Sequence, residues 1–185
     1  MIIGITGRIA TGKSTLAGVF SEMGFLLIDA DEIYHNLLET SDEMKNEILN
    51  RFGTLDRRNL FKRIKDDENS LSELNEITHK YVLSEINQII AKNDGSDIVM
   101  DVPIPVEHGF LDISDEVIVT TCSRDTQISR LVERDGISKS KAAAKIAIQL
   151  TSDYYESLGG TVVNTECMDM GDLRIFASGF IGNFG

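Results

Sequence analysis

Residues 7–15 read Gly-Arg-Ile-Ala-Thr-Gly-Lys-Ser-Thr, and this stretch decides the fold. It has the G-x-x-x-x-G-K-[ST] spacing of a phosphate-binding loop. The apolar, β-branched run at residues 1–6 predicts a buried strand before it, and residues 16–20 predict the start of a helix after it. Because the motif requires a strand, a glycine-rich turn and a helix in this order, we favour a phosphate loop over a glycine-containing turn with a chance lysine.

The residue types of this stretch suit phosphate chemistry. Gly7 and Gly12 let the backbone curl so that its N–H groups face inward, toward an anion. The positive end of the following helix adds to this cradle. Lys13 can reach the β- and γ-phosphates, and the Ser14 hydroxyl can ligate Mg²⁺. We expect the nucleotide to contact Gly7, Ala10, Thr11, Gly12, Lys13, Ser14 and Thr15.

The size and charge of the chain limit its class. A length of 185 residues suits one domain spanning residues 1–185, with a small insertion. The net charge of −12 argues against nonspecific nucleic-acid binding, which needs a basic face. Its apolar runs are too short to span a bilayer and no export signal is visible, so we expect a cytoplasmic protein that is not membrane-bound. Cys122 and Cys167 have neither a disulfide framework nor metal-site spacing.

Apolar runs recur at the spacing of a βαβ protein. Further strands are expected at residues 24–28, 97–101, 116–120 and 160–163, and helices at 126–134, 138–150 and 169–180. This alternation predicts an α/β fold: a five-stranded parallel sheet of the P-loop kinase type with helices on both faces. Residues 31–92 read as almost wholly helical. Because a crossover needs only about a dozen residues, they predict an inserted helical subdomain that holds a second substrate.

Aspartates follow two of these strands. Asp29 and Asp31 come at the end of the second strand, and ligands of parallel sheets bind beyond the carboxyl ends of the strands. One of them can accept the proton of an attacking hydroxyl or hold Mg²⁺ through water, and the alternative is that one caps the next helix. Asp101 ends the third strand, where it either supports Mg²⁺ or is an ordinary strand-end aspartate.

Residues 124–150 form the one basic segment. They carry six cations and three acids, a net +3, so the rest of the chain carries −15. Arg130 and Arg134 share one helical face. Such a segment is typical of a lid that closes over a triphosphate, and the alternative is a solvated basic helix pair. Arg57 or Arg58 can hold an acceptor phosphate, or lie on a solvated face. His35, His79 and His108 lack metal spacing, and packing or capping is open for His79.

The guanine-reading motif of GTPases is absent, and a large ATPase needs a longer chain, which leaves a small kinase. Among small kinases, the chain resembles the bacterial dephospho-CoA kinases over nearly its whole length. The similar segments are residues 5–15, Ile-Asp-Ala-Asp at 28–31, Leu-Asp-Arg-Arg-Asn-Leu at 55–60, Thr-His at 78–79, residues 102–107, 124–127 and 130–135, Gln149, and Val-Val-Asn at 162–164.

The resemblance implies transfer of the γ-phosphoryl group of ATP, with Mg²⁺, to the ribose 3′-hydroxyl of dephospho-CoA. The partners would be small molecules, with a chain that is monomeric or weakly homo-oligomeric. The implied catalytic residues are Asp31 as base, Lys13 and Arg134. Arg130 and Asn164 join the loop in binding nucleotide, and Ser14 and Asp101 hold the metal. Asp31, Arg57, His79, Pro103 and Glu107 are implied for the acceptor.

The chain departs from the family pattern at several positions. Arg8 and Ala10 stand where the family usually has glycines, Lys80 replaces a proline, and residues 150–164 contain neither lysine nor arginine. Two alternatives therefore stay open: another small-molecule or nucleoside-monophosphate kinase, and an ATP-binding regulatory protein without transfer activity.

Overall fold

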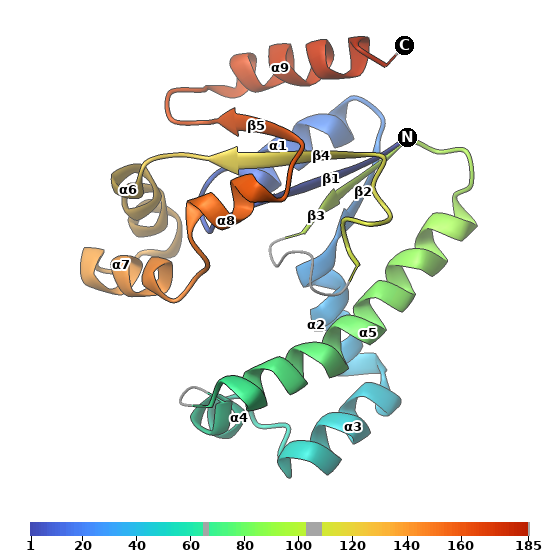
Figure 1. Cartoon of the computed structure of the whole chain (residues 1–185), viewed down its shortest axis with the longest axis vertical. Helices are drawn as coiled ribbons and strands as arrows, with labels where there is room; N and C mark the ends of the chain where they lie inside the picture. Colours follow the sequence, from blue (N-terminus) through green and yellow to red (C-terminus); the bar gives the residue numbers. More distant parts are fainter. Residues whose placement is uncertain (65–66, 103–108, 185) are drawn as a thin grey trace. The chain divides into compact units, whose positions relative to one another are not determined.

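A five-stranded parallel sheet forms the centre of the fold, as the sequence predicts (Figure 1). The computed structural model describes residues 1–64, 67–102 and 109–184. The strand order is β2-β3-β1-β4-β5, so β1 is central. The strands are β1 (Ile2–Gly7), β2 (Leu26–Asp29), β3 (Ile98–Asp101), β4 (Glu116–Thr121) and β5 (Thr161–Asn164).

The chain divides into two compact units, one made of Met1–Ile28 with Gly95–Gly185 and the other of Asp29–Asp94. The expected helical insertion, residues 31–92, falls within the second unit. Among the helices of the described ranges, none is long and apolar enough to cross a lipid bilayer.

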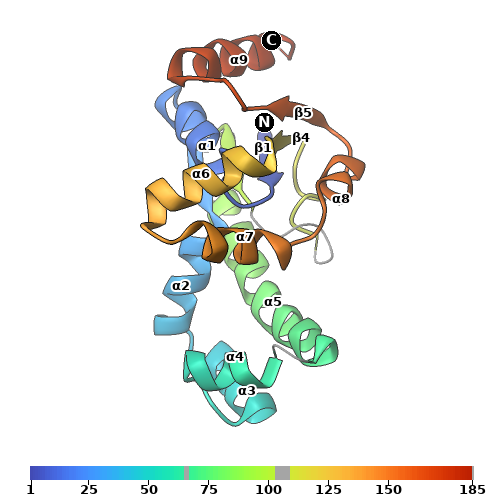
Figure 2. The same cartoon turned by 90° about the vertical axis from the view of Figure 1, so that its left-hand side faces the viewer.

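In the described part of the first unit, five helices accompany the sheet. The central strands β1 and β3 are buried almost throughout, as expected for strands covered on both faces. Phe20 packs edge-on against Phe25 and Phe180 within the main apolar cluster. Figure 2 shows α6 and α7 side by side. The helices are α1 (Lys13–Glu22), α6 (Arg124–Asp135), α7 (Lys139–Ala147), α8 (Ser152–Ser157) and α9 (Met170–Gly182).

The expected helix at 138–150 ends earlier in the structure, and a short helix follows it. α7 stops at Ala147, and α8 begins after Thr151, whose hydroxyl accepts from the N–H of Tyr154 at 3.3 Å. Six residues are too few to show a helical apolar period, which is why the sequence pattern did not predict α8.

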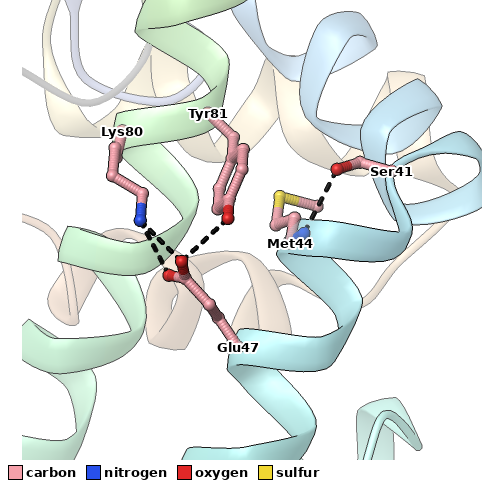
Figure 3. Close-up of polar contacts among 5 residues, drawn as sticks. All are labelled: Ser41, Met44, Glu47, Lys80 and Tyr81. Atoms are coloured by element: carbon pink, nitrogen blue, oxygen red, sulfur yellow. Dashed lines mark hydrogen bonds and ion pairs between the residues drawn. The ribbon is translucent and has the colours of Figure 1, made fainter.

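The second unit consists of α2 (Ala30–Thr40), α3 (Asp42–Phe52), α4 (Arg57–Ile64) and α5 (Glu68–Lys92). Its own apolar core contains Met44, Ile48, Phe52 and Leu74. Ser41 caps α3 by accepting from the N–H of Met44 at 3.2 Å (Figure 3). Such a separate core explains why this segment forms a compact unit of its own.

Lys80, a departure from the family pattern, joins two helices of this unit. Its Nζ lies 2.7 Å from Oε1 of Glu47, and the Tyr81 hydroxyl donates to the same carboxylate at 2.8 Å (Figure 3). These hydrogen bonds lower the pKa of Glu47 and raise that of Lys80. The lysine therefore ties α5 to α3.

Candidate functional site

The phosphate loop connects the central strand β1 to α1, and its two glycines have conformations that side chains disfavour. Gly7 has a φ of 140°, and a Cβ there would lie 2.4 Å from the carbonyl oxygen of Thr120 on β4. Gly12, the N-cap residue of α1, has a φ of 97°. Glycine is needed at Gly7 for close approach to β4 and at both positions for the backbone turn.

The N-terminus of α1 is built differently from that of its neighbours. Side chains of Asp29, Ser41, Ser123 and Ser138 cap α2, α3, α6 and α7. Gly12, the N-cap residue of α1, provides no such side-chain cap. The first N–H groups of a helix seek an acceptor, and an anion such as phosphate supplies one.

Lys13 lies over the loop that precedes it. Its side chain is largely buried, and Nζ donates to the carbonyl oxygen of Arg8 at 3.0 Å. The Thr11 hydroxyl donates to the same carbonyl at 2.7 Å and lies 2.7 Å from the hydroxyl of Thr120. The ammonium group is thus positioned by the loop itself.

Ser14, in the first turn of α1, lies against Asp101, the last residue of β3. The Ser14 hydroxyl donates to Oδ2 of Asp101, which is 5% exposed at the end of β3. A hydroxyl and a carboxylate are hard oxygen donors, so the pair fits Mg²⁺. In residues 1–64, 67–102 and 109–184, no group of three or more His, Cys, Asp or Glu side chains could hold a metal.

Arg130 on α6 reaches the phosphate loop. Nη1 donates to the carbonyl oxygen of Ala10 at 3.2 Å, and Nη2 donates to that of Thr165 at 2.7 Å. The guanidinium thus links the basic segment at residues 124–150 to the loop and to the turn after β5. Burial raises the pKa of the neighbouring Cys122 thiol, whose side chain is half-buried.

Arg134 lies in an exposed ion pair. Its side chain is 60% exposed, and Nε lies 2.7 Å from Oδ1 of Asp135, which also binds Lys145 at 2.9 Å. Hydrogen bonds from these two cations lower the pKa of Asp135 to about 2. For Arg134 to act on a phosphoryl group, it would have to exchange this carboxylate for the phosphate.

Asp29 and Asp31 have different surroundings in the second unit. Oδ1 of Asp29 accepts from the N–H groups of Asp31 and Glu32 at 2.9 and 3.1 Å, so the capping alternative applies to Asp29. Asp31 is an exposed residue of the first turn of α2, and its carbonyl oxygen lies 2.7 Å from Nδ1 of His35.

The other residues expected at the acceptor lie in α4, in α5 and outside the described residues. His79 is buried within α5. Arg57 begins α4, and its side chain lies outside the description. Pro103 and Glu107 also lie outside the described residues, as does His108.

Glu166, close to the expected Asn164, is a polar centre that the sequence did not reveal. It accepts from the N–H and hydroxyl of Ser123 at 2.6 and 2.7 Å, and from the Thr126 hydroxyl at 2.5 Å. These hydrogen bonds lower its pKa to about 2. Oδ1 of Asn164 accepts from the N–H of Glu166 at 2.9 Å. Ser123 signals a helix start, but no sequence pattern pairs it with residue 166.

Known proteins resemble this chain in sequence and in fold. The protein from Carboxydothermus hydrogenoformans named dephospho-CoA kinase is 35% identical over 174 residues, which cover 88% of this chain and 84% of that protein. The structure of TT1252 from Thermus thermophilus matches with a TM-score of 0.83 at 21% identity, covering 100% of this chain and 98% of the other. That of dephospho-CoA kinase from Campylobacter jejuni matches with a TM-score of 0.66 at 22% identity, covering 99% and 96%.

The chain also matches the sequence model of a whole protein family. The family model for dephospho-CoA kinase matches residues 1–168, which include the phosphate loop, the helical unit and the basic segment at residues 124–150. With this match and the 35% identical relative, the chain belongs to the dephospho-CoA kinase family.

Proposed function

We propose that this protein transfers the γ-phosphoryl group of ATP to the ribose 3′-hydroxyl of dephospho-CoA. The observation that carries the proposal is the contact of Ser14 with Asp101 beside an uncapped helix N-terminus, in a chain of this family. This arrangement suits the binding of a nucleotide triphosphate with its cation.

Charge stabilisation accounts for most of the proposed catalysis. The transferring phosphoryl group has a loose transition state with charge on its outer oxygens. Lys13 and the loop N–H groups would stabilise this charge, because they are fixed before the reaction starts. Ser14 and Asp101 would hold Mg²⁺, which when bound neutralises charge on the phosphates.

The transfer itself needs an oriented hydroxyl. The bond from the 3′-oxygen to the γ-phosphorus forms as the bond from that phosphorus to the leaving oxygen of ADP breaks. We assign the hydroxyl proton to the carboxylate of Asp31. Arg134, released from Asp135, would lie against the transferring group, and Arg130 and Asn164 would bind the nucleotide. Arg57, His79, Pro103 and Glu107 are assigned to the acceptor.

The remaining assignments are parts of the same proposal. The reaction is placed in the cytoplasm, with a monomer or weak homo-oligomer as the active form and with no nucleic-acid partner. None of these points changes the chemistry of the site.

The acceptor is tested by measuring ADP release with dephospho-CoA and a panel of other hydroxyl acceptors, including nucleoside monophosphates and shikimate. We expect turnover with dephospho-CoA far above the water background. Turnover with another acceptor, and none with dephospho-CoA, would show that the acceptor pocket has a different specificity.

The role of Asp31 is tested by D31N. Loss of a general base typically slows a reaction by about 10²- to 10⁴-fold. We expect kcat to fall in that range while ATP affinity, measured by calorimetry, stays unchanged. The matched control is E32Q, the exposed neighbour on the same helix turn. Unchanged turnover in D31N would remove Asp31 as the base.

A regulatory, non-catalytic function is the second candidate. It is favoured by the exposed ion pair of Arg134 with Asp135 and by the lack of lysine and arginine at residues 150–164. Tight ATP binding without turnover on any acceptor would support it.

A further inference from the structure

Both backbone polar groups of Ile9, in the middle of the phosphate loop, are held by side chains of the basic segment at residues 124–150. The N–H of Ile9 donates to Oε1 of Gln149 at 2.8 Å. Its carbonyl oxygen accepts from Nε2 of Gln127 at 2.7 Å. Gln127 is a residue of α6 and is 1% exposed, and Gln149 follows the end of α7. One residue of the loop is thus clamped by two glutamines more than 100 positions away.

The neighbouring loop residues are held by the same segment. Arg8 donates from Nη2 to the carbonyl oxygen of Ile146 at 2.8 Å. The carbonyl oxygen of Ala10 accepts from Arg130. Ile9 and Ala10 also pack against the apolar cluster of Leu131, Ala142 and Ile146. Three consecutive loop residues therefore contact the segment at residues 124–150.

The conformation of the loop explains why such support is needed. Ala10 has a φ of 61°, which a residue with a Cβ rarely adopts. Strained backbone of this kind persists only where the surrounding contacts determine it. A loop that binds phosphate through fixed N–H groups gains affinity when those groups are already oriented, since nucleotide binding need not pay for the ordering.

We propose that Gln127 and Gln149 are positioning residues that hold the phosphate loop at Ile9 in its phosphate-binding conformation. The segment at residues 124–150 then stabilises the conformation of the phosphate loop, in addition to any role as a lid over the nucleotide. This inference rests on the proposed function only in taking ATP as the ligand. The two glutamines act with opposite polarity, because Gln127 must donate a hydrogen bond and Gln149 must accept one.

The polarity provides the test at Gln149, which is only half-buried. Q149M removes the acceptor at similar size, whereas Q149E keeps an acceptor oxygen. ATP affinity is measured by calorimetry without an acceptor, at about 1 M salt, where the Debye length of about 3 Å screens the added charge of Q149E. We expect Q149M to weaken ATP binding by about three- to tenfold, the range of one lost hydrogen bond. Q149E should stay within about twofold of the wild type.

Ile148, 83% exposed and adjacent in sequence, supplies the matched control, and I148T should bind ATP as the wild type does. Q149M is also assayed for turnover. We expect its KM for ATP to rise while its KM for dephospho-CoA, at saturating ATP, stays unchanged. A purely structural role would instead affect both substrates. Wild-type ATP affinity in Q149M, or equal weakening in Q149M and Q149E, would overturn the proposal.

Two further results keep the interpretation separate from other failures. Q127M is expected to weaken ATP binding in the same direction, and if this buried substitution prevents folding, the Gln149 pair decides the question. A wild-type protein that binds ATP but does not phosphorylate dephospho-CoA would remove the proposed function. In that case the positioning role of the two glutamines is still judged from ATP affinity alone.

Discussion

Gly7 and Ala10 both have positive φ angles in the phosphate loop, but the space around them differs. At Gly7, a Cβ would lie 2.4 Å from the Thr120 carbonyl oxygen, so the β4 backbone itself would have to move. Ala10 already carries a Cβ at a φ of 61°. The first position thus requires glycine, whereas the second only disfavours other residues.

This difference predicts opposite outcomes for two small substitutions. G7A should destabilise the fold by more than about 2 kcal/mol and abolish ATP binding, because it combines a backbone clash with a disfavoured φ. A10G should change the free energy of unfolding by no more than about 1 kcal/mol, because relief of strain is offset by greater freedom of the unfolded chain. Urea unfolding monitored by circular dichroism measures both. A well-folded G7A would contradict this account.

The motif predicts Gly7, Gly12, Lys13 and Ser14 as phosphate-binding residues from their spacing alone. The contact of Ser14 with Asp101 joins residues 87 positions apart. The sequence indicates that the two residues lie near each other, because the loop before Ser14 follows one strand of a parallel sheet and Asp101 ends another. The carboxyl ends of such strands share one edge of the sheet. The glutamines at Ile9 had no such signal, because a polar side chain in a helix looks the same whether it is solvated or buried.

At the scale of single elements, the start of α6 depends on a residue from the far end of the chain. Ser123 caps the helix, and Glu166 accepts from both Ser123 and Thr126. Hydrogen bonds from these groups lower the pKa of Glu166 from 4.5 to about 2. The carboxylate thereby joins the first turn of α6 to the residues after β5.

The lowered pKa predicts the acid response of this contact. A carboxyl group with a depressed pKa in the folded state stabilises the fold above its unfolded pKa, and this contribution is lost as the pH falls through the folded pKa. The stabilisation by Glu166 is therefore present above about pH 4.5 and lost toward pH 2. E166Q should show a shallower decline of melting temperature over this window than the wild type, whereas the exposed control E133Q should not. Identical pH profiles for E166Q and the wild type would count against the contact.

The bounds of elements marked by continuous apolar runs could be predicted from the sequence. The bounds of elements that depend on particular side-chain contacts could not. The strands were predicted to within about two residues because buried parallel strands are continuous apolar runs. The helix at 138–150 was predicted too long. Its last expected residues leave α7, and Gln149 instead reaches Ile9. The end of that helix is set by a distant partner that periodicity does not contain.

On the scale of the whole molecule, the two units have separate apolar cores. Met44, Ile48 and Phe52 belong to the core of the Asp29–Asp94 unit, whereas the phosphate loop and its partners belong to the other. The long helical stretch was recognisable from sequence because a crossover needs far fewer residues. The ligand of this unit could not be recognised from the sequence, because the residues of an acceptor pocket have no fixed spacing comparable to that of the phosphate motif.

Separate cores predict separable effects of mutation. I48A removes a fully buried side chain and should destabilise the helical unit by about 2–5 kcal/mol. If the unit binds the acceptor, KM for dephospho-CoA should rise while the dissociation constant for ATP stays near the wild-type value. Calorimetric ATP binding and steady-state kinetics at a temperature below the unfolding transition measure the two. An equal loss of both affinities would mean that the units do not respond separately.

The last helix, α9, belongs to the folded core although it lies beyond the residues that the family model matches. The match to the family ends at residue 168, but α9 begins at Met170 and places Leu173, Ala177 and Phe180 in the main apolar cluster. Phe180 meets Phe20 of α1, the helix that starts at the phosphate loop, with ring centroids 6.2 Å apart. A chain truncated at residue 168 would therefore expose the outer side of α1 to water. Truncation for expression, or fusion to another protein, has to follow the packed core and retain the chain through Gly182.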